Sequence, residues 1–272
     1  MEIKILAPLW GHEHLDITTF CHKIKEAGYD GIDSWISDDP AIQKQLFDSL
    51  QKEQLLLISH QHQARGADFE AFKRSFWEYL QLSAKGGPIL MNCHTGKDYF
   101  TFQQNLELID IAAEFSAKTG LVVAHETHRG RVGFHPGVMQ DYFDARPELV
   151  ITADLSHWVC TSESWLENFQ VPLEEAIVRT RHIHSRVGFE EGPQIPDPRA
   201  QEWKYALDHF LGWWDRMVES RRQAGAKQLT ITTEFGPPPY MPMIPFKNEP
   251  VADQFEINCF MKNLLRQRYT RL

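Results

Sequence analysis

Four residues of the kinds that bind divalent metals each follow an apolar run in the second half of the chain. Each run has the composition of a buried strand, and each residue stands where the run gives way to polar residues. The residues are Glu126 in LVVAHETHRGR, Asp154 in LVITADLSH, His184 in TRHIHSR and Glu234 in QLTITTEF. Three carboxylates converging in a partly buried site repel one another unless a cation lies between them. The pattern therefore predicts one divalent metal ion bound by these four residues.

The spacing of these residues predicts repeated strand–helix units. Asp154 follows Glu126 by 28 residues and His184 follows Asp154 by 30, each about the length of one βα unit. Glu234 follows His184 by 50 residues, which leaves room for one unit and a long loop rich in Gly and Pro. We therefore expect the four residues to meet at one edge of a parallel sheet.

Apolar periodicity predicts eight such alternations without a composition break between them. Besides the four runs above, strands are expected at 2–8, 28–37, 55–59 and 89–92. Helices are expected at 15–27, 40–50, 69–82, 102–116, 138–145, 163–179, 201–222 and 253–268. Strict alternation of this kind predicts a (β/α)8 TIM barrel, forming a single domain over residues 1–272. An open doubly wound sheet is the alternative, but no Gly-rich phosphate turn follows the first strand.

Composition places the chain among globular proteins and disfavours several partners. It has 272 residues, a net charge of −9 and no basic block, so we expect no nucleic-acid partner. No apolar run approaches the ~20 residues that span a bilayer, so no membrane association is expected. The four cysteines are far apart and form no CxxC motif, which favours reduced thiols in a cytoplasmic enzyme.

Other ionisable residues gather at the same strand ends, whereas the strand entrances carry few. They include His60, His94, His157 and Arg186. A barrel's active site lies at the carboxyl ends of its strands, so we expect the active site here, with His60 and His94 as candidates for substrate contact. His60 and His94 are also compatible with plain loop positions, and His157 with a helix cap. Side chains alternate along a strand, which predicts that His182 points the same way as His184 but lies deeper.

Taken in order, the motifs HETH, DLSH, HIH and TTEFG resemble those of the xylose isomerase-like TIM-barrel superfamily, the sugar phosphate isomerase/epimerase group. The resemblance covers essentially the whole chain. It implies that Glu126, Asp154, His184 and Glu234 are the metal ligands. It also implies that His157 contacts the substrate or the surroundings of the metal, and that Arg186 holds a substrate oxygen.

The function that this resemblance implies is a metal-dependent sugar isomerase or epimerase. Its substrate would be a ketose, a sugar phosphate or an inosose-like polyol, and the reaction would pass through a metal-stabilised enediolate. Glu126 and Glu234 would be the acid/base pair. Oxygen-rich ligation with one imidazole suits Mn²⁺, Mg²⁺, Co²⁺ or Zn²⁺. The sequence leaves isomerisation, epimerisation and dehydration open, as it does a homo-oligomeric state.

Two alternatives stay open. The same superfamily contains endonuclease IV-like zinc phosphodiesterases, which bind three zinc ions. Much of their ligand set could be written here too, with His60 or His62, His94, His157 and the four proposed ligands. Those enzymes carry Asp-x-His after the seventh strand, whereas this chain has Asp197-Pro198-Arg199. Because arginine stays protonated and cannot bind zinc, this departure counts against the nuclease interpretation. The second alternative is a sugar-binding barrel without catalytic activity.

Overall fold

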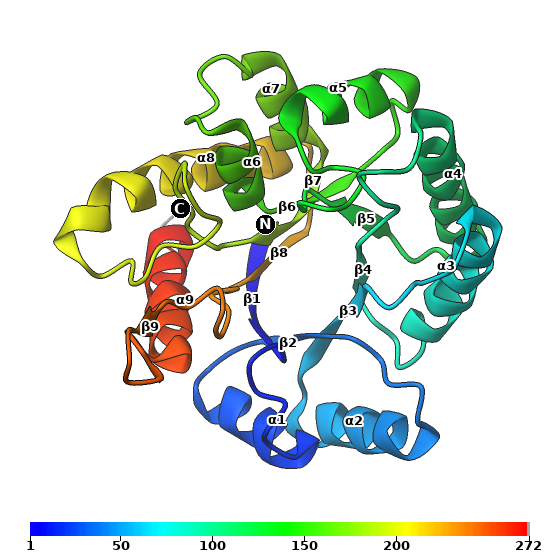
Figure 1. Cartoon of the computed structure of the whole chain (residues 1–272). Helices are drawn as coiled ribbons and strands as arrows, with labels where there is room; N and C mark the ends of the chain where they lie inside the picture. The colour runs from blue at the N-terminus through cyan, green and yellow to red at the C-terminus, as the bar shows by residue number, and fades with distance from the viewer. Residues whose placement is uncertain (271–272) are drawn as a thin grey trace.

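Eight parallel strands close into a barrel in the computed structural model, which describes residues 1–270 (Figure 1). The strands are β1 (Glu2–Pro8), β2 (Gly31–Ser34), β3 (Leu56–Gln61), β4 (Leu90–Cys93), β5 (Val123–Glu126), β6 (Ile151–Ala153), β7 (Thr180–His184) and β8 (Gln228–Thr232). Each strand pairs with the next, and β1 pairs with β8 through residues 2–6 and 228–232, which closes the ring. The predicted (β/α)8 fold is confirmed.

Helices surround the barrel (Figure 1). They are α1 (Ile17–Glu26), α2 (Pro40–Glu53), α3 (Phe69–Ser83), α4 (Phe102–Thr119), α5 (Pro136–Ala145), α6 (Leu155–Ser162), α7 (Gln170–Arg179), the 3-10 helix η1 (Gln201–Trp203), α8 (Lys204–Gln223) and α9 (Gln254–Thr270). Local sequence sets where several of them begin. Asp39 and Asp68 accept backbone N–H groups at the starts of α2 and α3. Thr101 forms a capping box with Gln104 at the start of α4.

The predicted helix at 163–179 is wrong in its first part. The chain forms α6 directly after β6, and α7 begins only at Gln170. The side chain of Asp154 accepts the backbone N–H of Ser156, so this residue starts a helix at the point where the strand ends. Glu163 then ends α6 in the left-handed conformation, with a φ of 48°. One residue of the DLSH motif is therefore both a candidate ligand and a helix cap.

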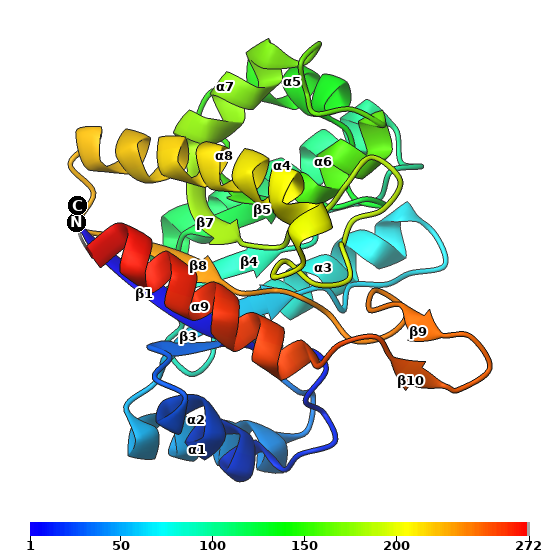
Figure 2. The same ribbon diagram turned by 90° about the vertical axis from the view of Figure 1, so that its left-hand side faces the viewer.

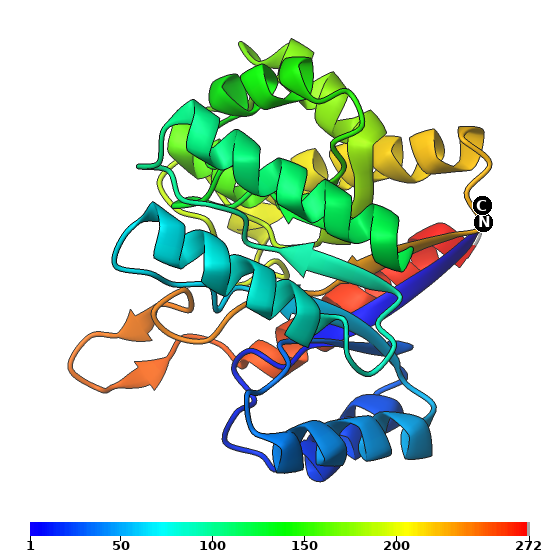
Figure 3. The ribbon, with the colours of Figure 1, turned by 90° about the vertical axis from the view of Figure 1, so that its right-hand side faces the viewer.

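The loops after the strands, with the short hairpin of β9 (Met243–Ile244) and β10 (Glu249–Pro250), lie at the end of the barrel opposite the start of β1 (Figures 2 and 3). This is the carboxyl end of the strands, where barrels carry their sites. All four cysteines are free. Over residues 1–270, no helix has both the length and the apolarity to cross a membrane.

The outer face of the sheet is packed by apolar helix faces, and α3 shows what this packing contributes. Phe76 is fully buried in a cluster with Leu80, Met91 and Phe115. We expect Phe76→Ala to lower the free energy of unfolding by about 3–5 kcal/mol, because it removes a buried ring and leaves a cavity. Urea unfolding followed by circular dichroism measures this loss. Glu78→Ala, on the exposed side of the same helix, is the control and should change stability by less than about 0.5 kcal/mol; an equal effect of both variants would contradict the packing described.

Candidate functional site

The four candidate ligands meet at the carboxyl end of the barrel. Glu126 and His184 are the last residues of β5 and β7, Asp154 directly follows β6, and Glu234 stands two residues beyond β8. Each offers one ligand atom, and these atoms all lie within 4.8 Å of one another. All four residues are buried. The structure thus brings the predicted set together, while their role as metal ligands stays a prediction.

Three of the converging atoms make no hydrogen bond: Glu126 Oε1, His184 Nδ1 and Glu234 Oε2. His184 Nδ1 lies 2.7 Å from Glu234 Oε2 and 3.5 Å from Glu126 Oε1. Buried polar atoms in native proteins nearly always have hydrogen-bond partners, so a convergent group without them indicates a ligand site. Carboxylate oxygens with one imidazole nitrogen suit the divalent metals expected from the sequence.

Asp154 differs from the other three because both of its oxygens have partners. Oδ1 accepts the backbone N–H of Ser156 at 3.1 Å and its hydroxyl at 2.5 Å. Oδ2 forms an ion pair with Arg186. Burial raises the pKa of Asp154 to about 6; Arg186 opposes the rise, and the charges of Glu234 and Glu126 add to it. This carboxylate is therefore held firmly and takes up a proton more readily than a solvated one.

His184 supplies positive charge next to the glutamates. Burial alone would lower its pKa, but the charges of Glu234 and Glu126 and a hydrogen bond to Asp33 raise it well above the usual value. Conversely, the imidazoles of His94 and His184 outweigh burial and hold the pKa of Glu126 well below its usual range. The imidazole of His184 therefore keeps its proton to a higher pH than a solvated histidine does.

Of the residues expected to contact a substrate, Arg186 lines the cavity and His157 supports it. Arg186 Nη2 donates to His157 Nε2 at 2.9 Å and lies 3.4 Å from Glu234 Oε2. The guanidinium also lies 4.9 Å from the ring centroid of Tyr240. His157 is fully buried on α6. We infer that His157 orients Arg186, while direct contact of either residue with a substrate stays a prediction.

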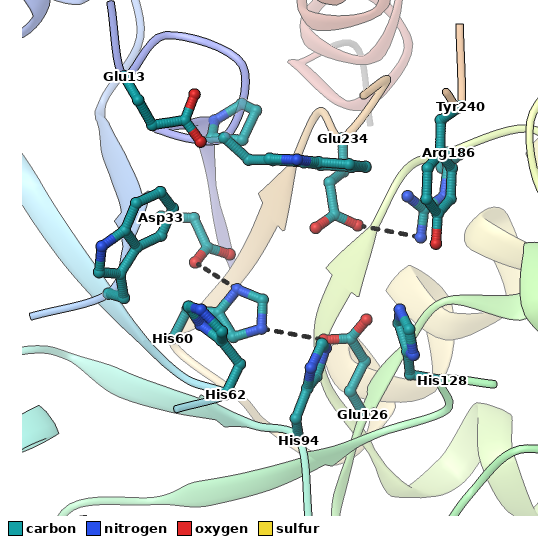
Figure 4. Close-up of a pocket in the computed structure, with 13 residues that line it drawn as sticks. Glu13, Asp33, His60, His62, His94, Glu126, His128, Arg186, Glu234 and Tyr240 are labelled. Carbon is teal, nitrogen blue, oxygen red and sulfur yellow. Dashed lines mark ion pairs between the residues drawn. The ribbon is translucent and has the colours of Figure 1, made fainter. Parts of the chain in front are cut away.

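His60 and His94 approach Glu126 at its second oxygen. His94 Nε2 lies 3.0 Å from Glu126 Oε2, and His60 Nε2 lies 3.7 Å from it (Figure 4). These three residues form a second group whose potential ligand atoms lie within 4.8 Å of one another. Burial lowers the pKa of His94 well below its usual value, although the charge of Glu126 opposes this shift. Both histidines line the cavity, while their contact with a substrate stays a prediction.

A cavity of about 390 Å³ opens above these side chains (Figure 4). It is lined by Pro8, Trp10, Glu13, Asp33, Trp35, His60, His62, His94, Glu126, His128, Arg186, Glu234 and Tyr240. The volume is in the range of small-molecule sites. The rings of Trp10 and Tyr240 meet edge to face, with centroids 5.0 Å apart, and add apolar surface to a charged wall.

Sequence reasoning missed several residues around this cavity. Asp33 stands near the carboxyl end of β2, a position of the same kind as that of Glu126. An acidic residue at a strand end was therefore a signal that the sequence offered for Asp33 as well. Asn92 donates to Glu126 Oε2 at 2.6 Å from the neighbouring strand β4. Trp10 and Tyr240 come from loops at opposite ends of the chain, and no spacing in the sequence relates them.

No family model matches the chain, and no curated protein matches it. Several solved structures do. The 3-keto-D-glucoside 4-epimerase of E. coli, in its apo form, has a TM-score of 0.64 at 14% identity, covering 98% of this chain and 100% of that one. A xylose isomerase-like TIM barrel protein from Mycobacterium smegmatis in complex with magnesium has a TM-score of 0.60 at 11% identity, covering 86% and 91%. Endonuclease IV from Thermus thermophilus has a TM-score of 0.59 at 11% identity, covering 100% of both chains.

At these identities the comparisons establish the fold. The chain has the fold of the xylose isomerase-like TIM barrels, so the resemblance carried by its four strand-end motifs is confirmed at that level.

Metal binding at this site should release protons. His184, with its raised pKa, gives up one proton near neutral pH, and Asp154, with a pKa of about 6, gives up a second at lower pH. Apparent Mn²⁺ affinity should therefore rise about tenfold per pH unit near pH 7, and more steeply below about pH 6. Calorimetric titration in buffers of different ionisation enthalpy measures both quantities. Asp154→Asn should lower the affinity at every pH and also remove the extra steepness, and an affinity independent of pH from 5 to 8 would contradict this assignment.

Proposed function

We propose that this protein is a divalent-metal-dependent isomerase or epimerase acting on a ketose, sugar phosphate or inosose-like polyol. The observation that carries this proposal is the convergence of three buried ligand atoms that make no hydrogen bond, from Glu126, His184 and Glu234, beneath a cavity large enough for a sugar. The fold shared with a 3-keto-D-glucoside 4-epimerase supports the substrate class. One divalent metal ion, of Mn²⁺, Mg²⁺, Co²⁺ or Zn²⁺, is the proposed cofactor.

Glu126, Asp154, His184 and Glu234 would hold the ion. A divalent ion bound there would supply Lewis acidity, polarising the substrate carbonyl and stabilising the negative charge of an enediolate. Asp154 is kept in place by its bonds to Ser156 and Arg186, so it contributes charge and geometry without a direct role in proton transfer.

Glu126 and Glu234 are the proposed acid/base pair. Their carboxylates lie on facing sides of the cavity (Figure 4). One removes the proton from the carbon beside the carbonyl. If the other returns a proton to the opposite face of that carbon, the product is an epimer; return to the neighbouring carbon gives an isomer. Two carboxylates on facing sides suit a reaction in which protons leave and return on different faces.

Arg186 is the proposed contact for a substrate oxygen. Its guanidinium lines the cavity beside Glu234 and is fixed by Asp154 and His157. A guanidinium held in this way keeps donors aimed into the site without losing side-chain entropy when the substrate binds. His60 and His94, on the other side of the cavity, are proposed to contact further hydroxyl groups.

Glu234→Gln tests the acid/base assignment against simple loss of metal. We expect it to slow exchange of substrate protons with D₂O by about 10²–10⁴-fold, because it removes a proton-transfer group. The measurement is deuterium incorporation by NMR over a panel of ketoses and inososes, at saturating Mn²⁺ with metal content determined. Asp154→Asn is the matched control, since it removes a ligand outside the pair and should recover at high Mn²⁺. Full exchange by metal-loaded Glu234→Gln would overturn the role of Glu234.

The second candidate function is a zinc phosphodiesterase of the endonuclease IV type. The group of His60, His94 and Glu126 favours it, because these three residues would suit a further metal ion. The fold shared with endonuclease IV is consistent with it. Against it, Arg199 occupies the position of the expected histidine and bonds to Asp197 through Nε at 2.9 Å.

Metal stoichiometry separates the two candidates. We expect dialysed protein to hold about one divalent metal per chain, because the four-residue centre gathers three carboxylates and one imidazole. The group of His60, His94 and Glu126 has a single carboxylate, whose Oε2 already accepts the amide N–H of Asn92. Elemental analysis after incubation with Zn²⁺ or Mn²⁺ counts the ions. Two or three Zn²⁺ per chain, reduced by His94→Ala, together with cleavage of an abasic duplex, would replace the isomerase proposal with the phosphodiesterase.

A further inference from the structure

We propose that Asp33, on β2, is a positioning residue that fixes the orientation and tautomer of His184, so that Nδ1 faces the metal centre. This inference rests on the proposed function, since it assigns a role toward the same metal ion. Asp33 is not among the four candidate ligands, and its carboxylate reaches His184 across the inside of the barrel from a strand that does not pair with β7.

The two ring nitrogens of His184 face different partners. Nε2 lies 3.1 Å from Asp33 Oδ2, whereas Nδ1 lies 2.7 Å from Glu234 Oε2. An ionised carboxylate can only accept, so the hydrogen bond with Asp33 requires a proton on Nε2. When the imidazole is neutral, the lone pair is then on Nδ1, the nitrogen that faces Glu126 and Glu234. A histidine that binds a metal through one nitrogen commonly donates its other N–H to a carboxylate.

Asp33 is itself held in place. The hydroxyl of Thr232, on β8, donates to the same Oδ2 at 3.0 Å, and His182 Nε2 lies 3.5 Å away. These contacts tie the carboxylate to both strands that carry or flank His184. Asp33 Oδ1 makes no hydrogen bond and lies 3.9 Å from His60 Nδ1 at the cavity wall (Figure 4).

The surroundings of Asp33 indicate a functional reason for its charge. Its side chain is 3% exposed, and its ion-pair partners over residues 1–270 are the imidazoles of His60, His182 and His184. Burying a carboxylate without a guanidinium or ammonium partner is costly, so such a group is a poor device for stability alone. A role in orienting the imidazole of His184 would explain why a carboxylate is buried at this position.

Mn²⁺ titration of Asp33 variants tests the role. We expect Asp33→Ala to weaken Mn²⁺ binding by about 10- to 100-fold, as removal of such carboxylate partners does elsewhere. Asp33→Asn keeps an acceptor without the charge and should fall between Asp33→Ala and the wild type. Free Mn²⁺ is measured by electron paramagnetic resonance on the full chain. Thr232→Val is the matched comparison: it removes a bond that holds Asp33 in place but leaves the carboxylate for His184, so it should weaken Mn²⁺ binding clearly less than Asp33→Ala does.

Thermal unfolding with and without Mn²⁺ separates positioning from a merely structural role. A positioning role predicts that Mn²⁺ raises the unfolding midpoint less in Asp33→Ala than in the wild type, because the gain follows affinity. An equal gain, with unchanged affinity, would overturn the role of Asp33 and leave the proposed metal centre standing. Failure of the wild type to bind Mn²⁺ would instead overturn the proposed centre, and this role with it.

A measurement on the wild type keeps the proposal testable even if the variants fail to fold. In Zn²⁺-loaded protein labelled with ¹⁵N at histidine, the resonances of His184 are those lost in His184→Gln. We expect a proton on Nε2 and none on Nδ1. A proton on Nδ1 would overturn the proposal.

Discussion

The burial of several carboxylates in one barrel mouth is the constraint on which the rest of the site depends. Glu126, Asp154, Glu234 and Asp33 are all buried there, and Arg186 and His184 supply positive charge beside them. Like charges held this close in a low-dielectric interior cannot all ionise without compensation. The raised pKa values of Asp154 and His184 provide this compensation, because both groups keep a proton that reduces the net negative charge. A cation that binds at the same place replaces those protons and removes the repulsion that requires them.

The backbone keeps these charges close because each one is attached to a strand end or to the residues just after it. Thr127 Oγ1 donates to the carbonyl of Asp154 at 2.9 Å and accepts its N–H at 2.8 Å, which ties the ends of β5 and β6 together. Asp154 then caps α6 and holds Arg186. A strand-borne site of this kind is more rigid than one built on long loops, and rigid donors suit a metal that requires fixed geometry.

Much of the fold and the four central residues could be predicted from sequence, because alternation and unit spacing follow directly from barrel geometry. The start of the helix directly after Asp154 could not be predicted. An acidic residue at a strand end can bind a metal, but it can also cap a helix, and Asp154 does cap α6. Asp33 carries the strand-end signal, but its role does not follow from that signal. Its contact with His184 spans 151 residues and crosses the barrel, so neither spacing nor local pattern reveals this contact. The contact between Trp10 and Tyr240 could not be predicted either. It forms only when the barrel closes and brings together two loops that are far apart in the sequence.

Glu126 belongs both to the four-residue group and to the group with His60 and His94, and its two oxygens have different surroundings. Oε2 accepts the amide N–H of Asn92 at 2.6 Å and faces His94 at 3.0 Å. Oε1 makes no hydrogen bond and faces His184. A carboxylate oxygen that already accepts a short bond from an N–H donor is a poorer ligand than one without a partner, because the donor occupies part of its lone-pair density and repels a cation. Asn92 thus directs the available lone pairs of Glu126 toward His184 and Glu234. This asymmetry favours a single-ion centre over a bridged pair, and with it the isomerase or epimerase interpretation over the phosphodiesterase one.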